Sequence, residues 1–275
     1  MTLTTASPAE AASGSLVFDP TALAQGRYRL RLVAGTDPAV AVAQQLRATC
    51  FGLPEADKDQ FDAAAQHLLV ETTDEGELVA CCRLCLLTAA EAGNAAATAG
   101  ADLSGSYTAS RYDLSALTAQ NLPMLELGRF CIHPERPDAD ILRLIWGALA
   151  QMVDHAQVRM LIGCTSFVGC DPAPYLQALT QLYHHHQPPN GWSITAQVEP
   201  HLPLADLALP TCDLRQAQRQ MPALLRSYLA MGGWVGDHLV VDHALDTLHV
   251  FTAVDIAAIP PARKRWLRAV SDTRS

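Results

Sequence analysis

Charged side chains interrupt four short stretches of the chain in which the neighbouring residues are apolar or follow a helical pattern. These residues are, in chain order, Arg47 with Phe51, Asp59 with Asp62, Arg83, and Glu126 with Arg129. A charge in the middle of a buried strand is costly unless it is paired. One interpretation is a structural network in which the charges neutralise each other. Six charges at four places, with two arginines on separate predicted strands, favour a functional cleft instead.

The spacing of Glu126 and Arg129 indicates how such a cleft opens. Residues three apart in a regular strand point to opposite faces of the sheet. A bulge at Gly128 adds one residue to this strand and brings both side chains toward one cavity. A bulged strand also separates from its neighbour, and the resulting slot exposes backbone groups to which an extended chain can bond.

The hydrophobic pattern predicts a mixed α/β sheet layered with helices. Alternating or continuous apolar runs predict strands, and an apolar stripe at every third or fourth residue predicts helices. The predicted strands cover residues 28–33, 67–71, 78–87, 125–133, 159–167, 192–198 and 247–254. The predicted helices cover residues 37–51, 140–155, 172–183 and 221–231, and residues 89–106 are predicted to form a mobile loop.

Length and composition set the expected organisation. The 275 residues are 49% hydrophobic, which is enough for one substantial core. We expect a flexible arm over residues 1–26, one domain over residues 27–275, and a C-terminal elaboration of that domain over residues 187–275. No apolar run approaches the roughly 20 residues that span a bilayer. Residues 1–15 also lack the pattern of a secretory signal, so we expect a cytoplasmic protein.

Charge and cysteine content argue against two classes of function. The net charge of −9 disfavours nucleic acid as a partner, because phosphate neutralisation needs a basic surface. Cys82 and Cys85 form a CxxC pattern, but no Cys or His pair at a suitable spacing completes a zinc set. We therefore predict no metal site and read the eight cysteines as reduced, mostly buried thiols.

The charged segments, taken with their neighbours, resemble the acyl-homoserine-lactone synthase superfamily, a branch of the GNAT fold. The residues that carry this resemblance are Arg47 with Phe51, Asp59-x-Phe61-Asp62, His67-Leu68-Leu69-Val70, Cys82-Arg83-Leu84 and Glu126-x-x-Arg129-Phe130. Further motifs are similar to those of L-ornithine N-α-acyltransferases: Gly105-Ser106-Tyr107, Tyr112-Asp113-Leu114, Glu126-Leu127-Gly128-Arg129, Leu144-Ile145-Trp146-Gly147, Gly163-Cys164-Thr165-Ser166-Phe167 and Gly233-Trp234-Val235-Gly236. Two positions depart from that pattern, because Arg111 stands where an acidic residue is usual and Phe130 where a serine is usual.

The resemblance implies a GNAT-like mixed twisted sheet with helices on both faces and an N-acyltransferase activity. It implies acyl carrier protein as partner, with its acyl-phosphopantetheine as donor and no separate cofactor. An amino acid, ornithine by this resemblance, would accept the acyl group on its α-amine, and peripheral contact with the inner membrane is expected for a lipid product.

The implied mechanism is direct attack of the amine on the thioester. Glu126 would act as general base and Arg129 would share the catalytic site. The remaining residues would bind substrate: Arg47 and Arg83 the acceptor carboxylate, Asp59 and Asp62 those arginines or a side-chain amine, and Phe51, Ser166 and Phe167 the walls of the pocket.

Three alternatives remain open at this stage. The first is a long-chain N-acyl amino acid synthase with the same donor and another acceptor. The second is an acetyl-coenzyme A acetyltransferase of the same fold, although residues 135–142 lack the glycine-rich loop that holds its pyrophosphate. The third is a non-catalytic acyl-binding protein of the same fold, against which the presence of both Glu126 and Arg129 argues.

Overall fold

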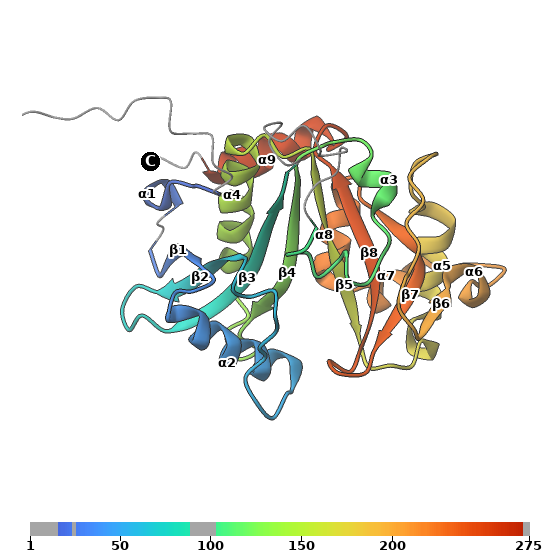
Figure 1. The fold of residues 1–275 in the computed structure, drawn as a ribbon, viewed down its shortest axis with the longest axis horizontal. Coiled ribbons are helices and arrows are strands. Elements are labelled where there is room, and N and C mark those ends of the chain that lie inside the picture. The colour runs from blue at the N-terminus through green and yellow to red at the C-terminus, as the bar shows by residue number, and fades with distance from the viewer. Residues whose placement is uncertain (1–15, 24–25, 89–102, 272–275) are drawn as a thin grey trace, which may run out of the picture.

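The computed structural model describes residues 16–23, 26–88 and 103–271. In this part of the chain, eight strands form one sheet in the order β1-β2-β3-β4-β5-β8-β7-β6 (Figure 1). The strands are β1 Tyr28–Ala34, β2 Gln66–Thr72, β3 Leu78–Leu87, β4 Met124–Ile132, β5 Met160–Val168, β6 His201–Pro203, β7 Trp234–Asp242 and β8 Thr247–Asp255. Neighbouring strands are antiparallel except for β4 and β5, which are parallel. The predicted mixed α/β sheet is therefore confirmed.

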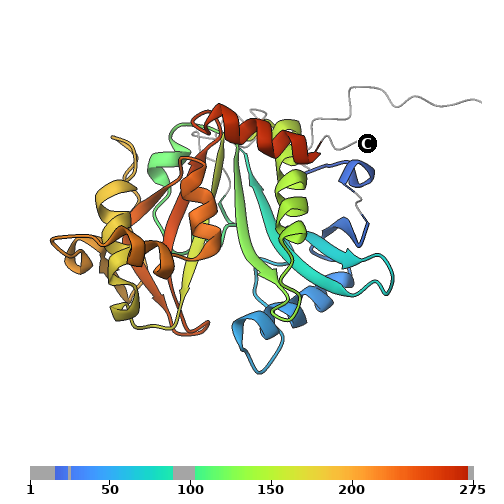
Figure 2. The ribbon, with the colours of Figure 1, turned by 180° about the vertical axis from the view of Figure 1, so that it is seen from behind.

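Helices cover both faces of this sheet. They are α1 Pro20–Leu23, α2 Ala39–Phe51, α3 Ser115–Thr118, α4 Ala139–His155, α5 Leu176–His185, α6 Leu204–Leu207, α7 Leu214–Gln220, α8 Ala223–Ala230 and α9 Pro261–Ser271, with a 3-10 turn at Ala173–Tyr175. Apolar residues of α4, α8 and α9 pack on one face of the sheet. In Figure 2 these helices lie in front of the sheet. Helix α2 packs on the opposite face against β1, β2 and β3.

The core of α4 explains why this segment forms a long helix. Asp138 caps its start, because the carboxylate accepts a hydrogen bond from the backbone N–H of Asp140 at 2.9 Å. Its buried face carries a stripe that includes Ile141, Leu144 and Ile145, with the spacing of an amphipathic helix. These residues lie against the apolar side of β4, and so the core holds in place the strand that carries Glu126.

The N-terminal arm and the loop after β3 are both predicted to lack fixed structure. The arm predicted over residues 1–26 is wrong for residues 16–23, because Leu16 is 2% exposed and Leu23 fully buried in the main core. The backbone N–H of Leu16 also bonds to the side chain of Gln66 at 2.9 Å. Residues 1–15, and residues 89–102 of the predicted mobile loop, lie outside the described residues.

The strand predicted over residues 192–198 is wrong. Its alternation is real, because Ile194 is fully buried and Trp192, Ala196 and Val198 pack beside it, but only a single bridge joins Ala196 to Tyr112. The segment is extended on the core without a strand partner. The pattern revealed neither β6, which is three residues long, nor β7, whose pairing with β8 shifts between Val235 and Leu239 and so disturbs the alternation.

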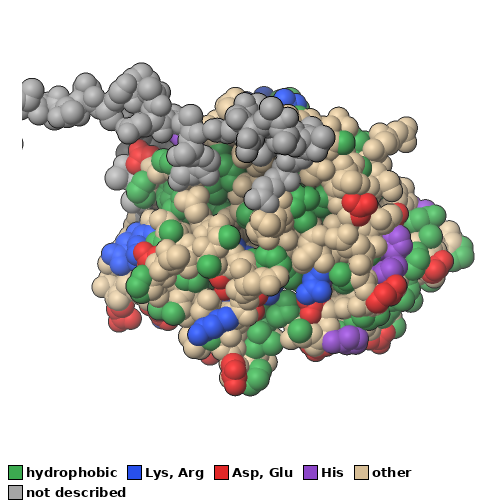
Figure 3. All heavy atoms as spheres, in the orientation of Figure 1, with side chains coloured by type: hydrophobic (Ala, Val, Ile, Leu, Met, Phe, Trp, Pro, Cys, Tyr) green, Lys and Arg blue, Asp and Glu red, His purple; other side chains and the backbone are tan. Residues whose placement is uncertain are grey.

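The face of the molecule in Figure 3 shows acidic and basic side chains in small, mixed groups. Histidines gather at one edge of this face, over the end of the sheet where β6 and β7 lie. No broad basic field covers this face.

Candidate active site

Glu126 lies in the middle of β4 and is only 3% exposed. Its carboxylate is held by three donors from consecutive residues of the opposing loop. The hydroxyl of Ser106 donates to one oxygen, and the backbone N–H groups of Tyr107 and Thr108 donate at 3.1 and 3.2 Å. Burial raises the pKa of Glu126, while the Ser106 hydrogen bond and the charge of Arg83 oppose that rise without cancelling it. The result is a fixed carboxylate whose affinity for protons is increased.

The strand that carries Glu126 bulges directly after Gly128. Gly128 lies opposite Arg83 and Cys131 opposite Cys81, so two residues of β4 face one residue of β3. Arg129 occupies the bulge with a φ of 50°, in the left-handed region that side chains other than glycine rarely adopt. The predicted bulge is therefore confirmed, and its strained residue is Arg129.

The parallel pair β4 and β5 parts at the same place. Their pairing extends only from Met124 with Met160 to Glu126 with Ile162. The next residue of β5 is Gly163, where an added Cβ would lie 2.4 Å from the carbonyl oxygen of Leu127. A side chain at position 163 is therefore incompatible with the close approach at which the two strands begin to separate. We call this point the fork; Glu126 lies at its base.

Three arginines and three aspartates form a closed ring of ion pairs beside the fork. Each guanidinium contacts two carboxylates, and each carboxylate contacts two guanidiniums. The pairs are Arg47–Asp57 at 2.9 Å, Arg47–Asp62 at 2.7 Å, Arg83–Asp59 at 2.5 Å, Arg83–Asp62 at 2.9 Å, Arg129–Asp57 at 2.7 Å and Arg129–Asp59 at 3.1 Å. The ring ties the loop that carries the aspartates to α2, β3 and β4.

The ring changes the roles expected for two of its members. The side chains of Arg47 and Arg83 are 1% and 3% exposed, both are paired within the ring, and neither lines a cavity beside Glu126. They therefore support the site from behind and leave no surface for an acceptor carboxylate. Burial alone raises the pKa of Asp62, but hydrogen bonding and charge from Arg47 and Arg83 outweigh it, and that pKa stays well below its usual range.

Two cavities meet beside the fork. The inner cavity, of about 270 Å³, is lined by residues from both faces of the sheet, with Leu224 and Tyr228 on the side of α8 and Thr108 on the other side. Five of the residues expected at the site also line it: Phe51, Glu126, Arg129, Ser166 and Phe167. The outer cavity, of about 530 Å³, is lined by residues 53–61 with Tyr107, Arg111, Arg129, Asp242, Ala244 and Leu245. Tyr107, Arg129 and Leu245 line both cavities, so the two cavities are adjacent.

Two polar side chains of β8 also line the inner cavity without a hydrogen-bond partner. They are Thr247, through its hydroxyl, and His249, through Nε2. The hydroxyl of Tyr112 donates to the carbonyl oxygen of His249 at 2.8 Å and lies 3.3 Å from its Nδ1. The single proton of the Tyr112 hydroxyl is thus engaged with the carbonyl oxygen. His249 Nδ1 is therefore the donor in the second contact, and Nε2 of the same ring is left as an acceptor. Burial lowers the pKa of His249 to about 4, and the ring is neutral at physiological pH.

The sequence reasoning missed several residues of the site. Asp57 completes the ring, Ser106 and Tyr107 hold Glu126, and Asp242 accepts a hydrogen bond from the Tyr107 hydroxyl at 2.9 Å. One signal for Asp57 was available, because three buried arginines need three carboxylates and only two had been assigned. His249 also gave a signal as a lone polar residue between the apolar Leu248 and Val250.

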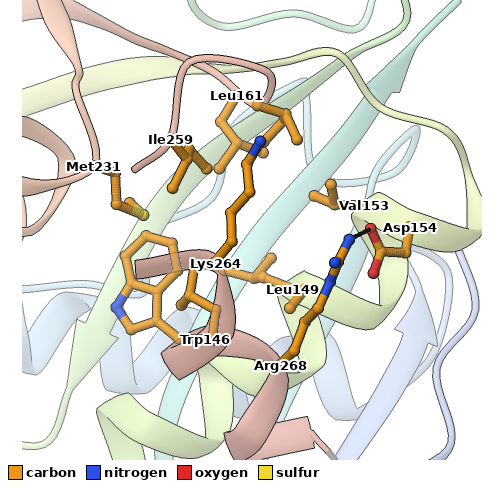
Figure 4. A pocket seen from close by; sticks show the side chains of 12 residues that line it. Trp146, Leu149, Val153, Asp154, Leu161, Met231, Ile259, Lys264 and Arg268 are labelled. Carbon is orange, nitrogen blue, oxygen red and sulfur yellow. Dashed lines mark hydrogen bonds and ion pairs between the residues drawn. The ribbon is translucent and has the colours of Figure 1, made fainter. Parts of the chain in front are cut away.

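A third hollow lies apart from these two, between α4 and α9. Figure 4 shows the side chain of Lys264 of α9 extending across the middle of the view, with Trp146 and Ile259 on one side of it and Val153 and Arg268 on the other. Arg268 lies 3.4 Å from Asp154 at the C-terminal end of α4. This hollow of about 90 Å³ shares no lining residue with the inner cavity and adjoins the end of β5 that is still paired with β4.

The fold and the site together define the class of protein. A parallel strand pair parts at a bulge in an otherwise antiparallel sheet, and a buried carboxylate stands at the fork. Residues 43–147, which include the bulged strand β4 and Glu126, match the family model described as an acetyltransferase (GNAT) domain. The chain is an acyltransferase of the GNAT class.

Curated relatives define the family more closely. An L-ornithine N(alpha)-acyltransferase of Rhodobacter capsulatus is 33% identical over 213 residues, which cover 76% of this chain and 78% of that protein. An L-ornithine N(alpha)-acyltransferase of Brucella abortus is 30% identical over 254 residues, which cover 85% and 86%. Among solved structures, FeeM, an N-acyl amino acid synthase from uncultured soil microbes, is 9% identical with a TM-score of 0.47, covering 84% of this chain and 92% of that one. The chain belongs to the L-ornithine N(alpha)-acyltransferase family.

None of the helices in the described ranges is both long and apolar enough to cross a membrane.

Proposed function

We propose that this protein transfers a 3-hydroxy fatty acyl group from acyl carrier protein to the α-amine of ornithine, giving lyso-ornithine lipid. The observation that carries the proposal is Glu126, a buried carboxylate with a raised pKa at the fork where the inner cavity opens. The names of the curated relatives support ornithine as the acceptor.

In the proposed reaction no residue of the protein becomes acylated. The α-amine loses a proton to Glu126, directly or through a water molecule, and its nitrogen attacks the thioester carbonyl carbon. The C–N bond forms and the C–S bond breaks, and the second proton that the nitrogen loses leaves on the pantetheine thiol. A backbone N–H group of the bulged part of β4 stabilises the oxyanion of the tetrahedral intermediate. The raised pKa of Glu126 suits it to accept the proton, because a base works best when its pKa approaches the working pH.

The start of α4 supports a carrier-protein donor over coenzyme A. A helix N-terminus that follows a strand can hold a pyrophosphate through its free N–H groups and its dipole. Here that end is already occupied by the carboxylate of Asp138, which accepts a hydrogen bond from the N–H of Asp140, a second acidic residue of the first turn. Asp138 is further fixed by Tyr28 and Arg27, at 2.8 and 2.7 Å. Two carboxylates repel a pyrophosphate from this helix end.

The test of the base is Glu126→Gln, assayed with a 3-hydroxyacyl carrier protein and ornithine. We expect a loss of about 10²- to 10⁴-fold in kcat, which is the usual contribution of a general base, with the fold retained. The matched control is Glu135→Gln, which removes an exposed carboxylate outside both cavities. Activity of Glu126→Gln near that of the wild type at neutral pH contradicts the assignment.

Basic residues near α4 and on α9 are the candidate contacts for the acidic carrier protein and for a membrane surface. Arg143 lies on α4, while Arg263, Lys264 and Arg265 lie on α9, where Trp266 is 42% exposed. Binding through these charges weakens as salt rises, because screening shortens their range. Affinity for acyl carrier protein, or for anionic vesicles, that does not change between low and high salt contradicts docking of that partner on these residues.

A second candidate is an N-acyl amino acid synthase with the same donor and another acceptor. It is favoured by one observation, the presence of Arg111 in the outer cavity. There it presents a positive charge to the acceptor, where similar proteins usually have an acidic residue. A panel of amino acids assayed with one acyl carrier protein donor separates the two candidates.

A further inference from the structure

Arg111 differs from the three arginines of the ring in its surroundings. It lines the outer cavity, and its side chain is 34% exposed, whereas the ring arginines are at most 9% exposed. The carboxylate nearest to it, that of Asp242, lies 3.7 Å away, beyond hydrogen-bond distance. Its Nε is buried and has no hydrogen-bond partner. Arg47 Nε and Arg83 Nη2 of the ring also lack a hydrogen-bond partner, so what sets Arg111 apart is its exposure to the outer cavity, which suits an anionic ligand.

Tyr107 links Arg111 to the fork. The guanidinium carbon of Arg111 lies 5.1 Å from the centre of the Tyr107 ring, and the Tyr107 hydroxyl donates to Asp242 at 2.9 Å. The backbone N–H of the same tyrosine donates to Glu126. Tyr107 also lines both cavities. One residue therefore contacts both Arg111 and the carboxylate at the fork.

The other charges in this region leave Arg111 as the suitable cation. The ring of ion pairs closes on itself with equal numbers of arginines and aspartates, so Arg129 is already committed although it lines the outer cavity. Lys58 also lines the outer cavity, but it is exposed to solvent, where an ion pair contributes little. Asp242 is held in place, because its other oxygen accepts the N–H groups of Ala244 and Leu245 at 3.0 and 3.2 Å.

We propose that Arg111 binds the α-carboxylate of the acceptor amino acid. The inference rests on the proposed function and names the part of the acceptor that each cavity receives. A carboxylate paired with Arg111 in the outer cavity places the α-amine two bonds further along the path past Tyr107, where Glu126 takes its proton directly or through a water molecule. Arginine is suited to this task because its planar fork binds a carboxylate through two parallel hydrogen bonds. The ligand class is thus a free α-amino acid with an unmodified carboxylate.

The experiment compares acceptors that differ only in the carboxylate. L-Ornithine, its carboxamide and 1,4-diaminobutane are assayed with one acyl carrier protein donor on the wild type, Arg111→Ala and Arg111→Lys. The wild type should prefer ornithine. Arg111→Ala should raise the KM for ornithine by about 10- to 100-fold, as expected for a lost hydrogen-bonded ion pair. Its kcat/KM for the diamine should not fall, because that acceptor has no carboxylate to pair with the arginine.

The KM of Arg111→Lys for ornithine should lie between those of the wild type and of Arg111→Ala, because lysine keeps the charge and loses the bidentate geometry. Arg215→Ala on α7 is the matched control, since Arg215 is exposed and lines neither cavity. An unchanged KM for ornithine in Arg111→Ala overturns the proposal. An equal loss for ornithine and for the diamine also overturns it, because it shows a general structural effect.

A binding measurement separates this proposal from the proposed function. Ornithine is titrated into the wild type and into Arg111→Ala without any donor, and the heat of binding is recorded. Weaker binding to Arg111→Ala, with the carboxamide binding both proteins alike, supports the assignment even if no acyl transfer is detected. Equal ornithine affinity of the two proteins overturns it, whatever the activity assay shows. An absence of transfer by the wild type to any acceptor counts against the proposed function alone.

Discussion

Replacement of Arg47 by methionine tests whether the ring of ion pairs is a structural support. Arg47 contacts Asp62 at 2.8 and 2.7 Å and Asp57 at 2.9 Å, and all three side chains are almost fully buried. Methionine fills a similar volume. It leaves three aspartates with only two arginines, so the ring carries a net negative charge. Breaking a buried ion pair from one side costs about 3–5 kcal/mol. In a protein of this size that cost lowers the Tm by roughly 10 °C.

The assay is urea or thermal unfolding at pH 7, with Arg31→Ala as the matched control. Arg31 pairs with Glu71 at 2.8 Å but is 42% exposed, and such a surface pair contributes about 1 kcal/mol or less. Since Asp62 has a lowered pKa when folded, its contribution is present above its unfolded value near 3.8 and is lost as the pH falls further. The difference between Arg47→Met and the wild type should therefore shrink in acid. A loss no larger than that of Arg31→Ala, or a 10-fold rise in acceptor KM without loss of stability, refutes the reasoning.

Three further substitutions probe the fork. Ser106→Ala removes a hydrogen bond that lowers the pKa of Glu126, so the acid limb of the kcat/KM profile should move to higher pH; an unmoved limb contradicts this role. The pKa of His249 is lowered from 6.5 to about 4, so the free energy of unfolding should fall by about 3 kcal/mol as the pH falls from 6.5 to 4. Unfolding of His249→Gln, followed across the same pH range, should not show this loss. Gly163→Ala places a Cβ 2.4 Å from the carbonyl oxygen of Leu127, so it should lower the Tm by several degrees, and an unchanged Tm contradicts the close approach.

The sequence predicted the strand that carries the site because Glu126 and Arg129 interrupt an apolar run that must lie in the core. It also predicted the bulge, because two charges three residues apart cannot otherwise face one cavity. The two interpretations weighed for the buried charges both apply, to different residues. Arg47, Arg83, Asp59 and Asp62 satisfy each other within the ring, whereas Glu126 stays outside the ring and lines the inner cavity.

The rest of the site depends on contacts that no local pattern encodes. Asp242 follows the apolar part of β7 and reaches Tyr107 only because β7 and β8 bring it there, 135 residues along the chain. Arg111 sits in an irregular segment, where neither the helical nor the strand period applies. The sequence showed it only as a departure from the pattern of similar proteins. The residues that surround Arg111 are known only from the fold, which places the segment before α3 against the fork.

The fork is lined from both faces of the sheet, and this has a consequence for the order of events in turnover. Leu224 and Tyr228 approach the inner cavity from the side of α8, whereas Tyr107 and the outer cavity approach it from the opposite side. Two substrates that enter by different routes do not displace each other, and both must be present before the bond forms. Initial-rate plots at varied donor and acceptor concentrations should therefore give intersecting lines. The product would then span the sheet, with its head group on one side and its chain on the other, so release requires one end to be drawn through the fork.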